Sequence, residues 1–148
     1  MKREITFLLI QFFLFAIFFI DIEGNYLPIP NWLYFGLLAF ILIGFMILFF
    51  GVVNLLGESK KANVMNGNRY VYHGIYKYIR HPIYAGILVA MFGYAIMEVS
   101  ILKLCVTLIM ATVFYFKSEQ EERWMIRKYS AYRKYRRTTG RFFPKFHS

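Results

Sequence analysis

The sequence predicts an all-α, polytopic membrane protein with about four transmembrane helices, of which the last two form a hairpin, followed by an amphipathic cytosolic helix. Three observations predict this fold class. Long apolar runs recur along the chain. Hydrophobic residues make up 59% of it and aromatic residues 21%, which suits lipid and its interfaces better than a water-soluble core. The formal net charge is +10, and most of the basic residues flank the apolar runs.

The first two predicted helices cover residues 5–20 and 32–56. Only Thr6 and Gln11 interrupt the first run, which at ~1.5 Å per residue reaches about 24 Å and falls short of the ~30 Å hydrocarbon core. The second run is uncharged and long enough to cross the bilayer with tilt. Residues 21–24 offer no small-residue cleavage site, so we expect the first helix to be retained rather than removed as a signal peptide.

The next apolar run, residues 83–116, is too long for one simple span. Near its middle, Glu98-Val99-Ser100 and Lys103 interrupt it. We therefore predict two helices, over residues 83–97 and 99–116, joined by a tight turn at this interruption.

Beyond residue 116 the chain is predicted to continue as a helix that leaves the membrane. Its apolar and aromatic positions, from Trp124 to Tyr135, recur at spacings of three and four, which gives the helix one apolar face. Gly140 is expected to end this helix. Residues 141–146 are then expected to lie extended along the membrane.

The distribution of charge predicts which side of the membrane each loop occupies. Residues 57–82 carry five basic residues and one acidic residue, and the tail from Lys117 carries ten basic and three acidic residues. The charged residues between the first two helices are Asp21 and Glu23 alone. Cytosolic loops of membrane proteins are enriched in Lys and Arg. We therefore expect an integral protein of the cytoplasmic (inner) membrane, with both termini and the 57–82 loop in the cytosol.

Arg80-His81-Pro82 stands at the start of the third predicted helix. Proline suits the first turn of a helix and disfavours helical geometry at His81. One interpretation is a helix start with an interfacial arginine and histidine. The other is that His81 and nearby backbone N–H groups face a polar cavity, where an anionic group such as a carboxylate is stabilised. Tyr76 and Tyr84 flank the tripeptide, either as part of an aromatic belt or as stacking partners for a flat ring.

Glu119, Glu121 and Glu122 form an acidic cluster just beyond the fourth predicted helix, in a region that is otherwise basic. Lys117 and Glu121 are four residues apart and share a helix face. The cluster is either a solvated acidic face with an ion pair, or a cation and an anion placed side by side at the mouth of a pocket. No metal site is expected, because the histidines and glutamates match no compact ligand motif and Cys105 is the only cysteine.

The tail from Arg127 to Lys145 interleaves Arg and Lys with Tyr and Phe. This mixture is compatible with binding to single-stranded nucleic acid, but on a chain with several apolar spans it favours the anionic headgroups of membrane lipids. We therefore expect membrane lipids and a lipidic or hydrophobic small molecule as partners. Neither nucleic acid nor an obligatory protein partner is expected.

The motifs of the C-terminal half, taken together, resemble a known family. The run Gly74-x-Tyr76-x-x-x-Arg80-His81-Pro82-x-Tyr84-x-Gly86 is followed by the predicted hairpin, then by Glu121-Glu122, Tyr132-x-x-Tyr135 and Arg141-Phe142-x-Pro144. This order resembles the isoprenylcysteine carboxyl methyltransferases, and phospholipid N-methyltransferases share the same general signature. The resemblance covers residues 64–146.

The resemblance implies an integral membrane methyltransferase that uses S-adenosylmethionine as methyl donor. From the length of the chain we expect residues 1–148 to form one domain, in which 1–56 are two N-terminal spans and, as the resemblance implies, 57–148 are the cofactor-binding catalytic region. It implies a cytosol-facing cofactor pocket lined by Asn68, Arg69, Tyr70, Val71, Tyr76, His81, Pro82, Ile83 and Tyr84. Glu121 would hold the ammonium group of the cofactor, and Lys117, where the carboxyl methyltransferases have an arginine, would lie near the acceptor. The catalytic residues expected on this basis are Lys117, Glu121 and Arg80.

The methyl acceptor stays open at this point. Methyl transfer from a sulfonium is an in-line displacement, for which the cofactor supplies the reactivity. A carboxylate acceptor, which the resemblance favours, needs no general base, whereas a phospholipid amine must first lose a proton to Glu119, Glu122 or His73. Two other classes also stay open: a membrane reductase with a nicotinamide cofactor, and a non-catalytic membrane protein whose basic tail binds lipids or partners.

Overall fold

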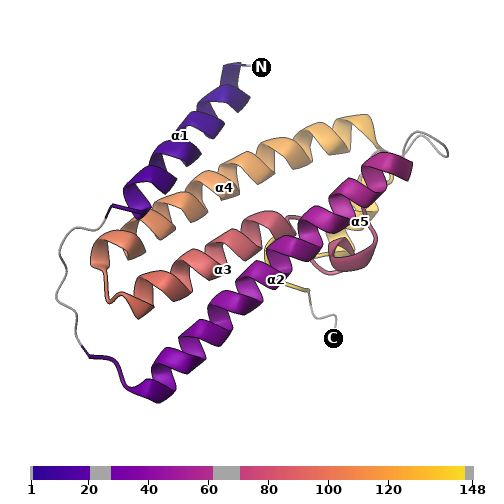
Figure 1. Cartoon of the computed structure of the whole chain (residues 1–148). Helices are drawn as coiled ribbons and strands as arrows, with labels where there is room; N and C mark the ends of the chain where they lie inside the picture. The colour runs from indigo at the N-terminus through magenta and orange to yellow at the C-terminus, as the bar shows by residue number, and fades with distance from the viewer. Residues whose placement is uncertain (1, 21–27, 62–70, 146–148) are drawn as a thin grey trace.

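The computed structural model describes residues 2–20, 28–61 and 71–145, and these are helical apart from short connections (Figure 1). No β-strand occurs in these three ranges beyond a single isolated bridge. The predicted all-α class is therefore confirmed. The elements in chain order are α1 (Lys2–Phe18), α2 (Asn31–Lys61), the 3₁₀ turn η1 (Gly74–Lys77), α3 (Pro82–Met97), α4 (Ile101–Lys128) and α5 (Tyr132–Thr138).

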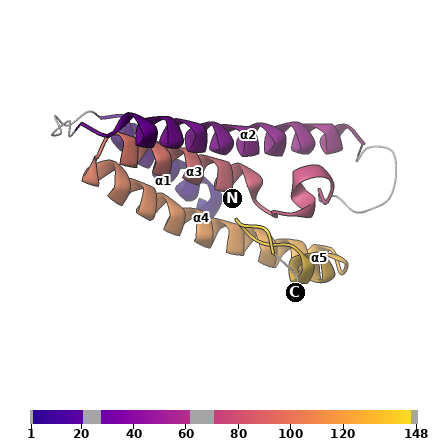
Figure 2. The ribbon, with the colours of Figure 1, turned by 90° about the horizontal axis from the view of Figure 1, so that it is seen from below.

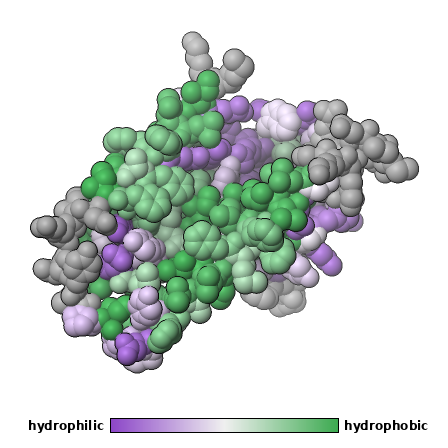
Figure 3. Space-filling model, in the orientation of Figure 1, coloured by the Kyte–Doolittle hydropathy of each residue, from purple (hydrophilic) through white to green (hydrophobic). Residues whose placement is uncertain are grey.

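Two of these helices, α2 and α4, are long and apolar enough to cross a membrane by length and composition. The helices α1 and α3 are apolar but shorter, and at ~1.5 Å per residue the sixteen residues of α3 extend about 24 Å. The count of four spans therefore stays a prediction. Apolar residues cover most of the face shown in Figure 3, and polar residues gather mainly around the C-terminal part of α4 and around α5.

The hairpin of α3 and α4 turns where the sequence predicts. Val99 has a φ of 50°, which places it in the left-handed region that tight turns use. Ser100 follows as the N-cap of α4, and its hydroxyl accepts a hydrogen bond of 3.3 Å from the backbone N–H of Lys103. Lys103 is buried and lies 3.7 Å from the carboxylate of Glu98. The polar residues that interrupt the apolar run thus close the turn.

The helices α2 and α3 pack backbone to backbone along much of their length (Figure 2). Glycine permits this approach, because a methyl group at Gly86 would lie 2.6 Å from both the carbonyl oxygen of Gly44 and the backbone nitrogen of Leu48. A methyl group at Gly44 would lie 2.7 Å from the backbone nitrogen of Ala90. In membranes such small-residue contacts replace the hydrophobic driving force between helices.

A further contact surface of the bundle joins α1 to the hairpin of α3 and α4. Leu14 and Phe18 of α1 are buried against residues of α3 and α4. The cluster also contains Met91 and Ala95 from α3, and Val106, Met110 and Phe114 from α4. This core fixes one end of α1, whereas toward its N-terminus α1 diverges from α4 (Figure 1).

The prediction of one continuous helix from residue 116 to Gly140 is wrong. The helix α4 ends at Lys128, Tyr129 is extended, and α5 covers only Tyr132–Thr138. Both Tyr129 and Tyr132 are buried, so the break turns two rings of the tail toward the protein. The residues after α5 then return alongside residues 79–81. That residues 141–146 lie along the membrane stays a prediction.

The packing of α2 against α3 generates a test. Gly86→Ala should destabilise the protein by about 1–3 kcal/mol, because the methyl group meets backbone atoms that cannot move aside independently. Gly36→Ala on α2 is the matched control, since nothing lies within 4 Å of a methyl group there, and it should be neutral or slightly stabilising. Unfolding in detergent measures both, and equal stability of the two variants would contradict this packing.

Candidate active site

The Arg80-His81-Pro82 motif is held in place by the C-terminal tail. Pro82 is the first residue of α3, and His81 is its N-cap residue, with φ −124° and ψ 63°. The backbone N–H of Arg80 donates to the carbonyl of Gly140 at 2.8 Å, and that of His81 donates to the carbonyl of Arg141 at 3.0 Å. The tail therefore satisfies backbone groups that the start of the helix leaves without intrahelical partners.

Gly140 permits this pairing because the chain turns sharply after it. A methyl group at this position would lie 1.7 Å from the carbonyl oxygen of Phe143. Every side chain larger than hydrogen is thus excluded. The sequence predicts that Gly140 ends a helix. In the structure, Gly140 instead allows a close backbone contact beside the motif.

A buried carboxylate, that of Glu122, joins the motif, α4 and the tail. Its side chain is 0% exposed. Oε1 accepts a hydrogen bond from Arg80 Nε at 2.8 Å and lies 3.1 Å from His81 Nε2. Oε2 lies 2.9 Å from Arg136 Nε and 3.5 Å from an Arg141 guanidinium nitrogen. A buried charge is stable only when paired and hydrogen-bonded, and this carboxylate has ion-pair partners on both oxygens.

The guanidinium of Arg80 continues the network into the tail. It donates to the backbone carbonyls of Arg136, at 2.8 Å, and of Thr139. Glu119, one turn before Glu122 on α4, pairs with Arg141 and lies 3.6 Å from Arg136. The tail is therefore attached to α4 through charge as well as through the backbone of the motif.

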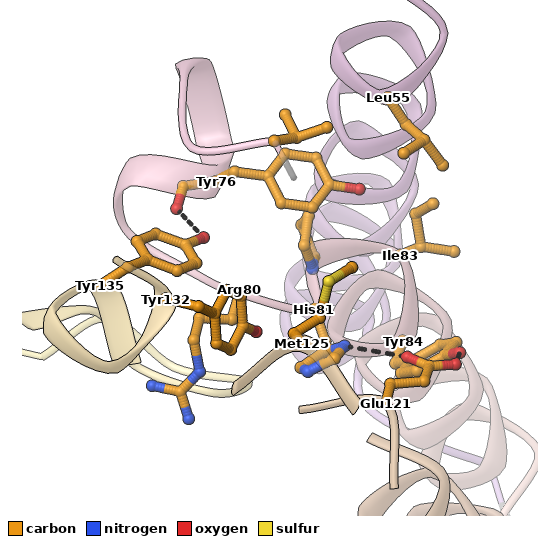
Figure 4. A pocket seen from close by; sticks show the side chains of 12 residues that line it. Leu55, Tyr76, Arg80, His81, Ile83, Tyr84, Glu121, Met125, Tyr132 and Tyr135 are labelled. Atoms are coloured by element: carbon orange, nitrogen blue, oxygen red, sulfur yellow. Dashed lines mark hydrogen bonds and ion pairs between the residues drawn. The ribbon is translucent and has the colours of Figure 1, made fainter. Parts of the chain in front are cut away.

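A cavity of about 310 Å³ opens beside this network (Figure 4). Its walls come from the end of α2, η1, the start of α3, the C-terminal part of α4 and α5. The lining residues are Leu55, Val71, Tyr76, Arg80, His81, Pro82, Ile83, Tyr84, Glu121, Met125, Tyr132 and Tyr135.

Glu121 supplies the carboxylate of this cavity. Its side chain is 41% exposed, in contrast to the completely buried Glu122 beside it. The hydroxyl of Tyr84 donates to Oε1 at 2.7 Å, and His81 Nδ1 lies 3.6 Å from Oε2. The two nitrogens of the His81 ring thus face two different glutamates, one in the network and one in the cavity.

Aromatic rings form the other walls. The rings of His81 and Tyr84 are parallel within 2° at a centroid distance of 5.5 Å, and Tyr84 stacks on Phe114 at 4.5 Å. The hydroxyl of Tyr135 donates to the backbone carbonyl of Tyr76 at 2.6 Å. Burial, together with the charge of Glu121, raises the pKa of Tyr76 to about 12, so this phenol is neutral at physiological pH.

The cavity gathers most of the predicted site residues. The eight that line it are Val71, Tyr76, Arg80, His81, Pro82, Ile83, Tyr84 and Glu121. Lys117 does not line it, but lies one turn along α4 from Glu121 in a neighbouring cavity. Asn68, Arg69 and Tyr70 lie outside the described residues.

Four lining residues were not predicted. Met125 follows Glu121 by one helical turn, a spacing that places it on the same face and offered a signal. Tyr132 and Tyr135 carried the family signature, but the expected continuous helix placed them away from the site. Leu55 offered no signal in the sequence, because nothing distinguishes it from the other apolar residues of α2.

Comparison with known proteins identifies the family. A sequence model described as phospholipid methyltransferase matches residues 32–132, which is more than half of the chain. The chain belongs to the phospholipid methyltransferase family. Membership indicates a membrane methyltransferase, in agreement with the two long apolar helices and with the resemblance seen in the motifs. No curated protein and no solved structure matches the chain in these comparisons.

The residues that the family model matches include most of those that line the cavity. The matched region runs from α2 to the first residue of α5 and includes all the cavity-lining residues except Tyr135. The helix α1 and the tail after Tyr132 lie outside it. The cavity is thus built mainly from the part of the chain that carries the family pattern.

The ion network generates the second test. Glu122→Gln should destabilise the protein by about 3 kcal/mol or more, because it leaves the buried guanidinium of Arg80 without a counter-charge. Glu119→Gln should cost less, since the side chain of Glu119 is 22% exposed and water replaces part of its interaction. Chemical unfolding in detergent ranks the two, and a larger loss at Glu119 would contradict the central place of Glu122.

Proposed function

We propose that this protein transfers a methyl group from S-adenosylmethionine to the carboxylate of a lipidic acceptor. The family supports methyl transfer in a membrane, and one observation supports the donor: a half-exposed carboxylate, Glu121, stands in an aromatic cavity beside the histidine of the family motif. We further propose four membrane spans, with both termini and the cavity on the cytosolic side, because the basic residues flank these parts of the chain.

The residues of the cavity fit this cofactor. A volume of about 310 Å³ is at the lower end of the range of small-molecule sites. The carboxylate of Glu121 matches an ammonium group, and its hydrogen bond from Tyr84 orients it. The rings of Tyr76, Tyr132 and Tyr135 offer apolar faces to a nucleobase. Arg80 donates a hydrogen bond to the carbonyl of Arg136 and so holds α5, which carries Tyr132 and Tyr135.

When bound, S-adenosylmethionine supplies an electrophilic methyl group on a sulfonium. Transfer would form the new bond from a lone pair of the acceptor to the methyl carbon and would break the carbon–sulfur bond, whose electron pair would stay on sulfur. The protein binds and orients the reactants and keeps water out. Glu121 positions the donor, and Lys117 attracts an acidic acceptor toward it.

The state of the glutamates supports a carboxylate acceptor. A carboxylate becomes a neutral methyl ester and releases no proton, so it needs no base. Glu122 is enclosed by Arg80, His81, Arg136 and Arg141, and Glu119 pairs with Arg141 and Arg123. These two carboxylates are therefore poor proton acceptors at neutral pH.

A second candidate is the methylation of a phospholipid amine, which the printed description of the family supports. This reaction requires the amine to lose a proton before it attacks. Glu121 is the remaining carboxylate of the cluster, and in our proposal it binds the donor. His73, the other candidate base, lines neither the aromatic cavity nor the one that contains Lys117. An acceptor that needs no base fits the described residues better.

Cofactor binding tests the role of Glu121. Glu121→Gln should weaken binding of S-adenosylmethionine by about 1.5–3 kcal/mol, roughly tenfold to a hundredfold in Kd, because it removes the charge partner of the ammonium group. Glu98→Gln, at the opposite end of the hairpin, is the matched control and should leave the affinity unchanged. Calorimetry in detergent measures both, and an unchanged affinity of Glu121→Gln would count against the assignment.

The chemical stability of the product tests the acceptor. Incubation of the protein with lipid extract and methyl-labelled S-adenosylmethionine should yield a labelled lipid whose label is released as methanol by mild alkali, since esters hydrolyse under these conditions. A label that survives alkali and migrates with a methylated amine headgroup would instead establish the second candidate. Mass spectrometry then identifies the acceptor.

A further inference from the structure

A basic hollow of about 490 Å³ lies beside α5 and shares no lining residue with the aromatic cavity of Figure 4. Its walls come from three segments of the chain: the end of α4, the helix α5 and the tail that follows α5. The lining residues are Ile126, Arg133, Arg136, Arg137 and Lys145. Four of these side chains are cations and none is an anion. The hollow therefore favours a negatively charged occupant.

Two carboxylates reach the edge of this hollow through Arg136. Its guanidinium lies 2.9 Å from Glu122 and 3.6 Å from Glu119. Glu119 also pairs with Arg123, and both glutamates pair with Arg141. Neither glutamate lines the hollow. The negative charge of the two glutamates is thus already used by the ion network of the motif and the tail.

The other three cations, Arg133, Arg137 and Lys145, lack a counter-charge in the described part of the chain. All three are exposed, and no ion pair between described residues includes them. Arg133 and Arg137 are four residues apart on α5, a spacing at which like charges destabilise a helix. Lys145 Nζ donates to the carbonyl of Arg137 at 3.1 Å, which adds a third positive charge at the same place. A bound anion would relieve this repulsion and accept from several charged donors at once.

The segments around the hollow place it at the level of the lipid headgroups. Phe142 and Phe143 line an apolar cavity together with residues of α3 and α4 from the predicted membrane-spanning run. Two residues span at most about 7 Å, so Lys145 lies close to this apolar surface. On the other wall, the exposed Trp124 precedes Ile126 by two residues, which is about 3 Å along α4. Tryptophan is enriched at the boundary between lipid and water.

The opposite face of α5 belongs to the aromatic cavity. Tyr132 and Tyr135 line that cavity, and the hydroxyl of Tyr135 donates to the backbone carbonyl of Tyr76 at 2.6 Å (Figure 4). Arg133 and Arg137 follow these tyrosines by one and two positions and so point to a different side of the helix. A helix of seven residues is marginal by itself, so the position of α5 depends on contacts on both of its sides.

The hollow is complete only while α5 and the tail are docked. Ile126 belongs to α4 and Lys145 to the tail, and α5 supplies the three arginines between them. A ligand that contacts all three segments binds the docked arrangement better than an undocked one, and by linkage it stabilises that arrangement. In the docked arrangement Tyr132 and Tyr135 line the aromatic cavity.

We propose that this hollow binds the headgroup of an anionic phospholipid, and that the bound lipid holds α5 on the aromatic cavity. The sequence predicts only that the basic tail as a whole favours anionic headgroups. The structure adds a defined site and connects it to the cavity through one short helix. Lipid binding does not depend on the proposed function, whereas its effect on the donor rests on it, because the aromatic cavity is there taken as the donor site.

Native mass spectrometry in detergent tests the binding. Phosphatidylglycerol should bind with a Kd about tenfold lower than that of phosphatidylcholine, which carries the same phosphate but no net charge. An equal concentration of inorganic phosphate should not displace it, since the phosphate ion has no acyl chains to lie on the neighbouring apolar surface. Displacement by inorganic phosphate, or by a single-stranded oligonucleotide at equal concentration, would overturn the lipid as the occupant.

Substitutions on α5 separate a defined site from general attraction by the net charge. Arg133→Gln and Arg137→Gln should each raise the Kd of phosphatidylglycerol about fivefold. Lys134→Gln removes the same charge from the same helix, at a residue that does not line the hollow, and is the matched control. It should leave the Kd within about twofold. An equal loss in Lys134→Gln would overturn the site.

The arginine variants are expected to keep the fold. Neither arginine has an acidic partner among the described residues, and each substitution relieves their mutual repulsion. Unfolding in detergent without added lipid should therefore show equal or higher stability than in the unsubstituted protein. A lower stability would mean that the two arginines hold α5 without a ligand, and would overturn their assignment to a lipid.

Binding of S-adenosylmethionine tests the connection to the aromatic cavity. Its Kd should be about fivefold lower in nanodiscs that contain phosphatidylglycerol than in nanodiscs of phosphatidylcholine alone. The Arg133→Gln/Arg137→Gln double variant should lose this difference, and Lys134→Gln should retain it. Equal affinity in both membranes would overturn the connection. Selective lipid binding by a protein that binds no S-adenosylmethionine would contradict the proposed function and leave the lipid site standing.

Discussion

The carboxylate of Glu122 is the interaction on which the site depends. It is completely buried, and its two oxygens are divided between the motif, through Arg80 and His81, and the tail, through Arg136 and Arg141. An isolated buried charge is strongly unfavourable, so these four partners and the carboxylate must assemble together. Once they do, the His81 ring is fixed by one of its nitrogens, and the other is directed at Glu121.

Two adjacent glutamates thus have opposite surroundings and, in our proposal, opposite roles. Successive residues of a helix point about 100° apart, so if Glu122 faces the network, Glu121 must face another part of the protein. That part is the junction of two cavities, one aromatic and closed by the tail, the other bounded by α1.

Helices and their turn could be predicted because they follow from local properties. The length of each apolar run set the helices, and Glu98-Val99-Ser100 marked the turn that the structure forms. The approach of His81 and Glu121 followed from the resemblance to a family and not from spacing. The break at Tyr129 could not be predicted, because neither glycine nor proline marks it in the sequence. The fold-back of Gly140 could not be predicted either, because it depends on contacts with residues sixty or more positions earlier.

The pairing of residue 80 with residues 136–140 has a consequence for the order in which the site assembles. All the apolar helices precede the tail in the chain. Until the tail folds back, Arg80 lacks its carbonyl partners on Arg136 and Thr139, and Glu122 lacks the guanidinium of Arg136. Docking of residues 136–141 onto the motif and α4 therefore completes the ion network after the helices have packed.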